Sequence, residues 1–336
     1  MFEVSGVCNA KCPYCCNGNG IASPKGQGHF ISVELFQKII DHLLSQKIIV
    51  GGGQNISLYN WGEPLLHPHI EEIQQYLIKK SVPYNISTNG SIYKEILSPT
   101  SLSISTSGFS QSSYDRIHKV NFQTVLINVE KFSHDIDPQK ILVKYFVYKF
   151  NIDEISAAKE YYENLGVRFQ LFMPYFNDGN ELMQYFRKEL SPERYLQAKK
   201  DMFLEPFEYL RPLLSAGVQG CSFLKEEQLT IDETGQLLRC CTLRRTCPDY
   251  ALGNVLNLTR DDIERLQKET PPICNHCISV LNPDQFHGKW GKTVPLPLQE
   301  IISPYVTYRP VSIQDAILRQ KVLIKSGLDY VVRKFK

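Results

Sequence analysis

Long apolar runs, a strong net charge and internal repeats are all missing from this sequence. No stretch approaches the ~20 consecutive apolar residues of a membrane-spanning helix, so no transmembrane segment is expected. The 37 basic and 35 acidic residues leave a net charge of +2, which gives no electrostatic reason to expect nucleic acid or a membrane as a partner. The 336 residues suffice for one large core with a small appended domain.

An export signal is missing as well. The first residues lead directly into a candidate metal ligand at Cys8, so no signal peptide is expected before the fold. Ten cysteines without an export signal are more consistent with metal ligands in a reducing compartment than with disulfides. We therefore expect a cytoplasmic protein that binds metal.

Three cysteines lie close together near the N-terminus, at Cys8, Cys12 and Cys15, with spacings of three and two residues. A 4Fe–4S cluster is usually held by four thiolates. Three ligands within eight residues would leave one iron open for a ligand that is not protein. A zinc site more often shows paired Cys-x2-Cys elements or a Cys/His set, and zinc remains the alternative here.

The spacing of these cysteines, with Tyr14 directly before the third, resembles the radical S-adenosylmethionine (SAM) superfamily. The resemblance implies that the open iron chelates the amino and carboxylate groups of SAM. It also implies that Tyr14 lies over the adenine edge. A reducing partner such as flavodoxin or ferredoxin would supply the electron.

Strand and helix patterns alternate over the first ~170 residues, which predicts an α/β fold with a parallel sheet and right-handed crossovers. A doubly wound sheet and an open barrel fit the pattern equally well, and the resemblance favours a partial (β/α)6 barrel. In both, ligands bind at the carboxyl ends of the strands. The predicted strands span residues 2–7, 55–60, 83–89, 101–106, 140–149 and 168–173, and the predicted helices lie from 32, after 68, within 110–133 and over 154–165.

Two of these strand ends carry further matches to the superfamily. Gly62-Glu63 resembles the "GGE" element that binds the SAM amino group, although Trp61 stands where the first glycine usually lies. Thr88-Asn89 resembles the "TNG" stretch near the ribose. A strand-to-helix turn with a capping carboxylate is the structural alternative for the first element, and a simple Asn-Gly turn for the second.

The later strand ends give weaker matches. Ser105 ends a strand where many relatives have a serine followed by Asp-Gly, and it would contact the methionine carboxylate or the ribose. The expected aspartate is absent, so that corner differs from the family pattern. Met173 suits an adenine pocket, although core packing would explain it equally well.

A second set of cysteines follows a predicted helix over 191–204. Hairpin signals over 228–240 and a helix over 260–268 separate its members. This order resembles the twitch module, the short form of the SPASM domain, and implies one auxiliary 4Fe–4S cluster. A structural zinc site is the alternative. The four predicted ligands are Cys221, Cys240, Cys274 and Cys277.

Three cysteines remain outside both sets. Cys16 and Cys241 each adjoin a predicted ligand and are expected to pack as small apolar residues. Cys247 follows Arg244 and Arg245, a basic setting that lowers a thiol pKa. Some radical epimerases of related build use a cysteine as hydrogen-atom donor, so the resemblance makes that role for Cys247 a hypothesis beside that of an inert or alternate-ligand cysteine.

The predicted domain order combines these features. A connector helix separates the two cysteine-bearing domains, and a tail with an amphipathic helix follows. The boundaries are 1–190 for the partial barrel, 191–220 for the connector, 221–290 for the twitch-like domain and 291–336 for the tail.

The resemblance implies an enzyme that cleaves SAM reductively and abstracts hydrogen from a substrate, giving oxidation, epimerisation or a related rearrangement. Only seven residues precede Cys8, whereas peptide-modifying relatives often carry a leader-binding domain there. A small polyol, aminosugar or nucleoside-sugar substrate is therefore expected, with a ribosomally made peptide as the alternative. The alternative from a different functional class is a non-catalytic iron–sulfur or zinc protein that serves as a scaffold or sensor.

Overall fold

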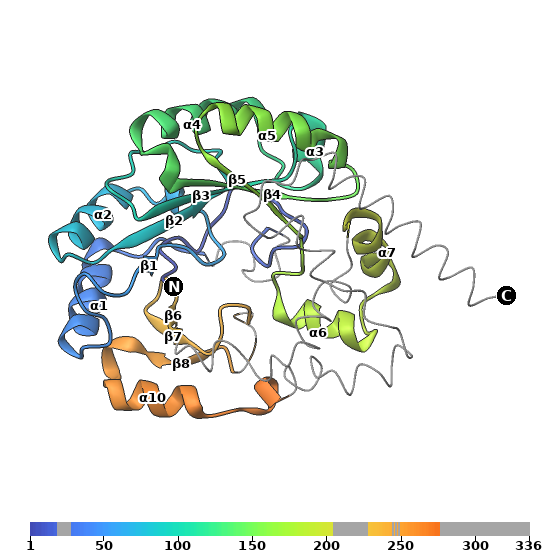
Figure 1. Cartoon of the computed structure of the whole chain (residues 1–336). Coiled ribbons are helices and arrows are strands. Elements are labelled where there is room, and N and C mark those ends of the chain that lie inside the picture. The colour runs from blue at the N-terminus through green and yellow to red at the C-terminus, as the bar shows by residue number, and fades with distance from the viewer. Residues whose placement is uncertain (19–27, 204–227, 244, 246, 248, 276–336) are drawn as a thin grey trace.

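The computed structural model describes residues 1–18, 28–203, 228–243, 245, 247 and 249–275. Its larger part is a parallel sheet of five strands in the order β1-β2-β3-β4-β5, with helices along its outer side (Figure 1). Each strand pairs with the next one along the chain. The strands are β1 Ile56–Ser57, β2 Tyr84–Thr88, β3 Ser101–Thr106, β4 Ile141–Phe146 and β5 Arg168–Phe172.

The outer helices form where apolar residues recur at helical spacing after a capping side chain. In α1, the Ser32 hydroxyl accepts from Leu35 N, and Phe36, Ile39 and Ile40 are buried against the sheet. The helices of this part are α1 Val33–Ser45, α2 Ile70–Lys79, α3 Gln111–Arg116, α4 Phe122–Asp135, α5 Ile155–Asn164, α6 Gly179–Arg187 and α7 Pro192–Asp201, with short 3-10 turns at Pro64–Leu66, Pro138–Lys140 and Ile152–Glu154.

The sheet has one apolar and one polar face in its middle strands. Along β3, Leu102 and Ile104 are fully buried in the core shared with the helices. Ser103 and Ser105 alternate with them and point to the opposite, partly exposed face. This inner face is where an open barrel presents its ligand-binding side chains.

The first predicted strand differs from expectation. Residues 2–7 form isolated bridges rather than a sixth ladder. Phe2 N donates to Ser57 O in β1, and Glu3 N donates to Ile231 O on its other side, both at 2.8 Å. The N-terminal residues therefore lie between the two sheets of the molecule, as Figure 1 shows.

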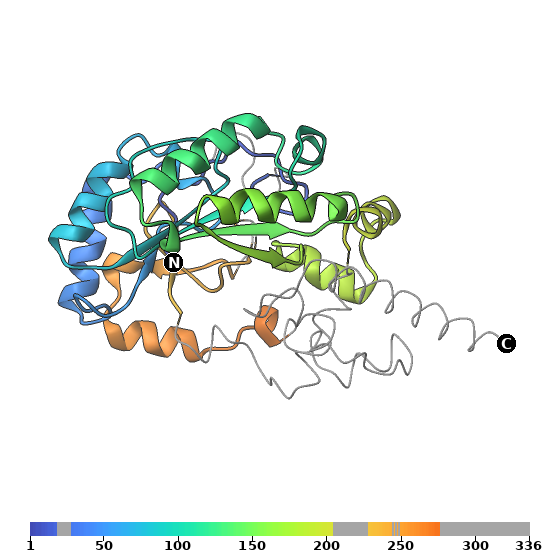
Figure 2. The ribbon, with the colours of Figure 1, turned by 45° about the horizontal axis from the view of Figure 1, so that its top comes forward.

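The C-terminal part is a small antiparallel sheet followed by a helix (Figure 2). Gly235 turns the predicted hairpin with φ +82°, a conformation that glycine adopts without strain. The predicted capping box between Thr259 and Asp262 is present. Its elements are β6 Thr230–Ile231, β7 Gln236–Leu238, β8 Ala251–Asn254, a 3-10 turn Val255–Asn257 and α10 Arg260–Lys268.

The α/β class with a small appended α+β part is confirmed by this architecture. The predicted helices over 154–165, 191–204 and 260–268 are present as α5, α7 and α10. The ligand positions Cys221 and Cys277 and the tail 291–336 lie outside the described residues. Within the described ranges, every helix is too short or too polar to cross a membrane.

Candidate functional site

The segment 8–16, called the cysteine loop below, lies beside the carboxyl end of β2. Cys8, Cys12 and Cys15 are each partly exposed. The Asn89 side-chain amide, one residue after β2, donates to Cys8 Sγ at 3.8 Å. Within the loop, Cys15 N donates to Cys12 O at 3.2 Å. The fold therefore brings the predicted cluster ligands to the strand end at which a parallel sheet binds ligands.

The surroundings of the three thiols suit a highly charged inorganic group. Burial raises the pKa of Cys8 to about 12, and the neighbouring Glu63 carboxylate raises it further. Burial also raises the pKa of Cys12 and Cys15, and for Cys12 the other two thiols add to the effect. Three thiolates are stable in this loop only with strong positive charge between them.

A single zinc ion is the alternative to a cluster at these cysteines. In the described ranges, no three His, Cys, Asp or Glu side chains are arranged around one ion. In a 4Fe–4S cluster each thiolate binds a different iron, so its ligands are spaced more widely than those of one zinc ion.

Glu63 joins the ends of β1 and β2. Its Oε1 accepts from Leu65 N at 3.0 Å and from Thr88 Oγ1 at 2.8 Å, and its Oε2 accepts from Asn89 N at 2.8 Å. The residue is 2% exposed, and burial raises its pKa to about 7. Among the described residues no basic side chain forms an ion pair with it, so the site fits an added cationic group.

Asn89 connects this strand end to the cysteine loop. Its side-chain amide donates to Asn9 Oδ1 at 3.0 Å, and its Oδ1 accepts from Ser91 N at 2.9 Å. Asn9 Nδ2 donates in turn to Ser91 Oγ at 2.8 Å. Three of the predicted site residues, Glu63, Thr88 and Asn89, thus form one hydrogen-bonded group with the loop.

Gly62 is required by a close approach of two backbone segments. A Cβ at this position would lie 1.6 Å from Ser5 O and 2.9 Å from Val7 O. The preceding Trp61 is buried against Cys16, and its Nε1 has no hydrogen-bond partner among the described residues. Cys16 is fully buried against Trp61, and its Sγ donates to Asn177 O at 3.7 Å, so it packs inside the protein but not in a wholly apolar environment.

Tyr14 lies under α7, a contact that the sequence did not indicate. Its hydroxyl donates to Asp201 Oδ2 at 2.8 Å. The Arg194 guanidinium lies 4.9 Å from the Tyr14 ring centroid and donates to Pro13 O at 2.6 Å. Arg194 and Asp201 are seven residues apart and thus on one face of α7, and that spacing is the only sequence signal for the contact.

Ser105 faces the inner side of the sheet in register with two polar residues. It pairs with Lys144 on β4, which pairs with Gln170 on β5. Burial lowers the pKa of Lys144, and its Nζ lies 5.8 Å from the Phe172 ring centroid. No ion pair to Lys144 is present in the described part of the chain, so sequence reasoning missed a cation on this face.

The remaining predicted residues lie away from this group. Met173 is 8% exposed and packs in the main core. Cys247 packs with Cys240 beside Leu238 in the C-terminal part. Its basic neighbour Arg245 is engaged with Glu233.

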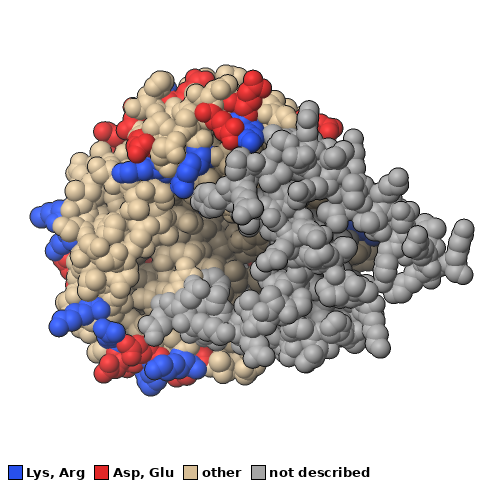
Figure 3. Space-filling view, in the orientation of Figure 1, with Lys and Arg blue, Asp and Glu red and all other residues tan. Residues whose placement is uncertain are grey.

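The outer surface of the described part carries its charges over the helices. Figure 3 shows Lys, Arg, Asp and Glu over the outer helices and around α10, whereas the described surface toward the centre of the view is hollowed and mostly free of charge.

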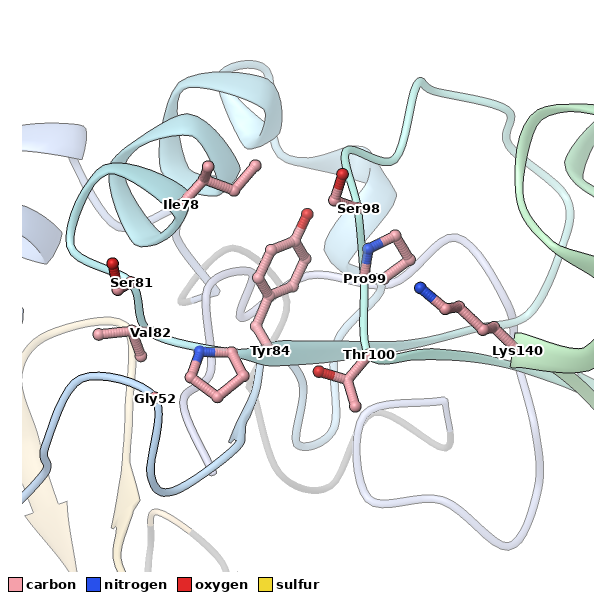
Figure 4. A pocket seen from close by; sticks show the side chains of 10 residues that line it. Gly52, Ile78, Ser81, Val82, Tyr84, Ser98, Pro99, Thr100 and Lys140 are labelled. Atoms are coloured by element: carbon pink, nitrogen blue, oxygen red, sulfur yellow. The ribbon is translucent and has the colours of Figure 1, made fainter.

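A cavity of about 470 Å³ lies at the opposite, amino end of the strands. Figure 4 shows Tyr84 at the start of β2, between Ile78 and Pro99. Ligand sites of parallel sheets lie at the carboxyl ends, and none of the cysteines lines this cavity. We therefore place the candidate site at the cysteine loop and not at this cavity.

Comparison with known proteins agrees with this geometry. The model of the radical SAM superfamily matches residues 2–184. The antilisterial bacteriocin subtilosin biosynthesis protein AlbA of Bacillus subtilis strain 168 is 22% identical over 315 residues, which cover 86% of this chain and 65% of AlbA. The chain thus spans just under two thirds of the length of this curated relative.

Two solved structures align with this chain. Streptococcus suis SuiB bound to precursor peptide SuiA aligns with a TM-score of 0.54 at 12% identity, over 78% of this chain and 63% of that chain. Native anSMEcpe with bound AdoMet aligns with a TM-score of 0.49 at 14% identity, over 78% and 79%. At such identities the SuiB alignment shows the fold alone.

The chain belongs to the radical SAM superfamily, because the family model covers more than half of it. The superfamily, which the motifs predicted, is confirmed, and the twitch-type auxiliary site stays a prediction. The predicted cofactors of the first site, a 4Fe–4S cluster and SAM, are those of this superfamily.

Proposed function

We propose that this protein binds a 4Fe–4S cluster in the cysteine loop, cleaves SAM reductively and abstracts hydrogen from a substrate. The observation that supports this proposal is the hydrogen-bonded group formed by Glu63, Thr88 and Asn89 with the loop that carries Cys8. Bound in this way, the cofactors supply an electron and a 5′-deoxyadenosyl radical.

The cofactor end of the site is assigned to the predicted residues. Cys8, Cys12 and Cys15 would ligate the cluster. Glu63 would accept from the SAM amino group, because its carboxylate already receives three donors and an ionised carboxylate can accept about four. The backbone at Gly62 would approach the same group.

The nucleoside end is assigned to residues on the neighbouring elements. Thr88 and Asn89 would lie near the ribose, and Ser105 near the ribose or the methionine carboxylate. Tyr14 and Met173 would border the adenine. Tyr14 is held rigidly by its hydrogen bond to Asp201, which limits its freedom when a ligand binds.

The inner face of the sheet would hold the substrate. Lys144 is a cation on this face, as is Arg168, which lies two residues before Gln170 on β5. Lys144 stands two strand spacings, about 10 Å, from the β2 end that contacts Cys8, and it would bind an anionic group of the ligands. Desolvation on this face strengthens such an attraction.

The C-terminal part would hold one auxiliary 4Fe–4S cluster through Cys221, Cys240, Cys274 and Cys277, with zinc as the alternative. Cys247 as a hydrogen-atom donor is a secondary proposal. A flavodoxin or ferredoxin would act as reductant, and a cytoplasmic location follows from the chemistry. The domain boundaries given above belong to the same proposal.

The substrate class is a ribosomally made peptide in this proposal, because AlbA acts in the biosynthesis of a bacteriocin and is similar over 86% of the chain. A small polyol, aminosugar or nucleoside-sugar substrate is the alternative. The outcome at the substrate would depend on whether the substrate radical loses an electron, regains a hydrogen atom or forms a new bond, giving oxidation, epimerisation or bond formation respectively.

The test is an anaerobic assay of the reconstituted protein with dithionite and SAM. Formation of 5′-deoxyadenosine is expected, and a Cys12→Ala variant should form none. Deuterium transfer from labelled peptide or sugar candidates into 5′-deoxyadenosine would identify the substrate class. Absence of 5′-deoxyadenosine from protein with about eight irons and eight sulfides would refute the enzyme proposal and leave the scaffold or sensor.

A further inference from the structure

Glu3 lies beside the loop that follows β1, and its carboxylate is the acceptor for three consecutive backbone amides of that loop. Asn60 N donates to Oε1 at 3.4 Å, while Trp61 N and Gly62 N donate to Oε2 at 2.5 and 3.1 Å. Glu3 is 3% exposed. Successive amides that converge on one point form a nest that favours an electronegative group, and here the Glu3 carboxyl group of the chain itself occupies it.

The segment that carries Glu3 is fixed on both sides. Phe2 N donates to Ser57 O in β1 at 2.8 Å. On the other side, Glu3 N donates to Ile231 O in β6 at 2.8 Å, and Ile231 N donates to Met1 O at 3.0 Å. The carboxylate therefore has a fixed position relative to both sheets.

The other end of the loop also rests on this segment. Glu63 N donates to Val7 O at 2.8 Å. The absence of a side chain at Gly62 lets its backbone approach Ser5 O. The backbone of the 60–63 loop, which carries the Glu63 side chain, is thus held by contacts with residues 3–7.

A buried charge from the C-terminal part adjoins the same segment. Glu233, in the turn between β6 and β7, is 2% exposed and pairs with Arg245 through both carboxylate oxygens. A Cβ on Gly6 would lie 2.2 Å from Glu233 Oε1. Burial raises the pKa of Glu3 to about 8, and the Glu233 charge acts in the same direction, so the two carboxylates interact.

We propose that Glu3 is a positioning residue that holds the 60–63 loop in the shape that binds the methionine end of SAM. We further propose that Arg245 neutralises Glu233, so that the Glu233 charge does not displace the Glu3 side chain from the 60–63 loop. The inference rests on the SAM-binding role proposed for Gly62 and Glu63. Since Glu3 acts through backbone amides that the loop would otherwise leave unpaired, its loss should weaken SAM binding.

The test measures the SAM dissociation constant of the full-length, anaerobically reconstituted protein by equilibrium dialysis, beside iron content and thermal unfolding. Glu3→Leu removes the acceptor and should raise the dissociation constant about a hundredfold, whereas Glu3→Gln keeps one oxygen and should raise it about tenfold. Glu34→Gln, an exposed glutamate on α1, is the matched control and should leave it unchanged.

The second pair of variants tests the Arg245–Glu233 ion pair, whose residues lie outside the 60–63 loop. Arg245→Met leaves Glu233 charged beside Glu3 and should raise the dissociation constant about tenfold, and Arg245→Met/Glu233→Gln should restore it to within about threefold. If Glu3→Leu loses iron or unfolds, the dissociation constants of Arg245→Met and Arg245→Met/Glu233→Gln test the proposal in its place. Wild-type affinity in Glu3→Leu or Arg245→Met at full iron content would overturn the inference. Lack of SAM binding by the wild-type protein would instead overturn the proposed function.

Discussion

Arg194 provides a quantitative test of how the cysteine loop is held. Its guanidinium donates to the two carboxylate oxygens of Glu181 at 2.8 and 2.9 Å and to Pro13 O at 2.6 Å. The two side chains are 17% and 6% exposed, so the pair is largely desolvated. Replacing Arg194 by Met leaves the Glu181 charge buried without its cation, which costs about 3–5 kcal/mol.

The expected stability loss follows from that figure. For a domain of this size, each kcal/mol lowers the melting temperature by roughly 2–4 °C, so Arg194→Met should melt at least about 6 °C below the wild type. Denaturant unfolding of the anaerobic protein would measure the same loss, and iron retention should fall with it because Pro13 lies between two ligands of the loop.

Two control variants separate this explanation from a general effect of mutation. Arg194→Met/Glu181→Leu removes both charges and should recover most of the stability. Lys38→Met breaks an exposed pair on α1 in which Lys38 is 61% exposed, and should cost less than about 1 kcal/mol. If Arg194→Met were no more destabilising than Lys38→Met, the proposed support of the cysteine loop by α7 would be wrong.

Three further predictions concern the site. Gly62→Ala should unfold or lose iron, because its Cβ would overlap Ser5 O; wild-type iron content and melting temperature would contradict this. The raised pKa of Glu63, about 7 against the usual 4.5, means that the folded state holds its proton more tightly. Relative to Glu63→Gln, the wild-type protein without cofactors should therefore lose stability as pH rises from 4.5 to 7 and none above; denaturant titrations at pH 5, 6, 7 and 8 that show a constant difference would argue against it. Lys144→Met should keep or slightly raise the melting temperature, since it removes a desolvated charge, yet lower 5′-deoxyadenosine formation at least about tenfold; unchanged turnover would remove Lys144 from the site.

The local parts of the site could be predicted from sequence because their signals are short. The cysteine spacing and the Gly62-Glu63 and Thr88-Asn89 pairs each lie within a few residues at strand ends. The alternation of strands with amphipathic helices then predicts that these ends meet on one edge of the sheet. The hydrogen bonds from Thr88 and Asn89 to Glu63 agree with that expectation.

The supporting contacts could not be predicted, because they join residues that are far apart in the chain. Asp201 contacts Tyr14 across 187 positions, and the seven-residue spacing of Arg194 and Asp201 does not by itself identify Tyr14 as their partner. Glu3 lies in a stretch that resembles an ordinary strand, and only the packing of the loop after β1 gives its carboxylate three amide donors. Lys144 alternates with buried residues along β4, which predicts the face of the strand on which it lies. The sequence does not show that Lys144 has no ion pair among the described residues.

Electron paramagnetic resonance tests the central claim, that the cysteine loop holds a cluster whose open iron binds SAM, most directly. The sample is the reconstituted Cys240→Ala/Cys274→Ala variant, which isolates the first site, reduced with dithionite with and without SAM. The account predicts a reduced 4Fe–4S signal whose g values shift when SAM is added and which disappears in a further Cys12→Ala variant. A spectrum that SAM leaves unchanged, or a cluster that persists after Cys12→Ala, would contradict it.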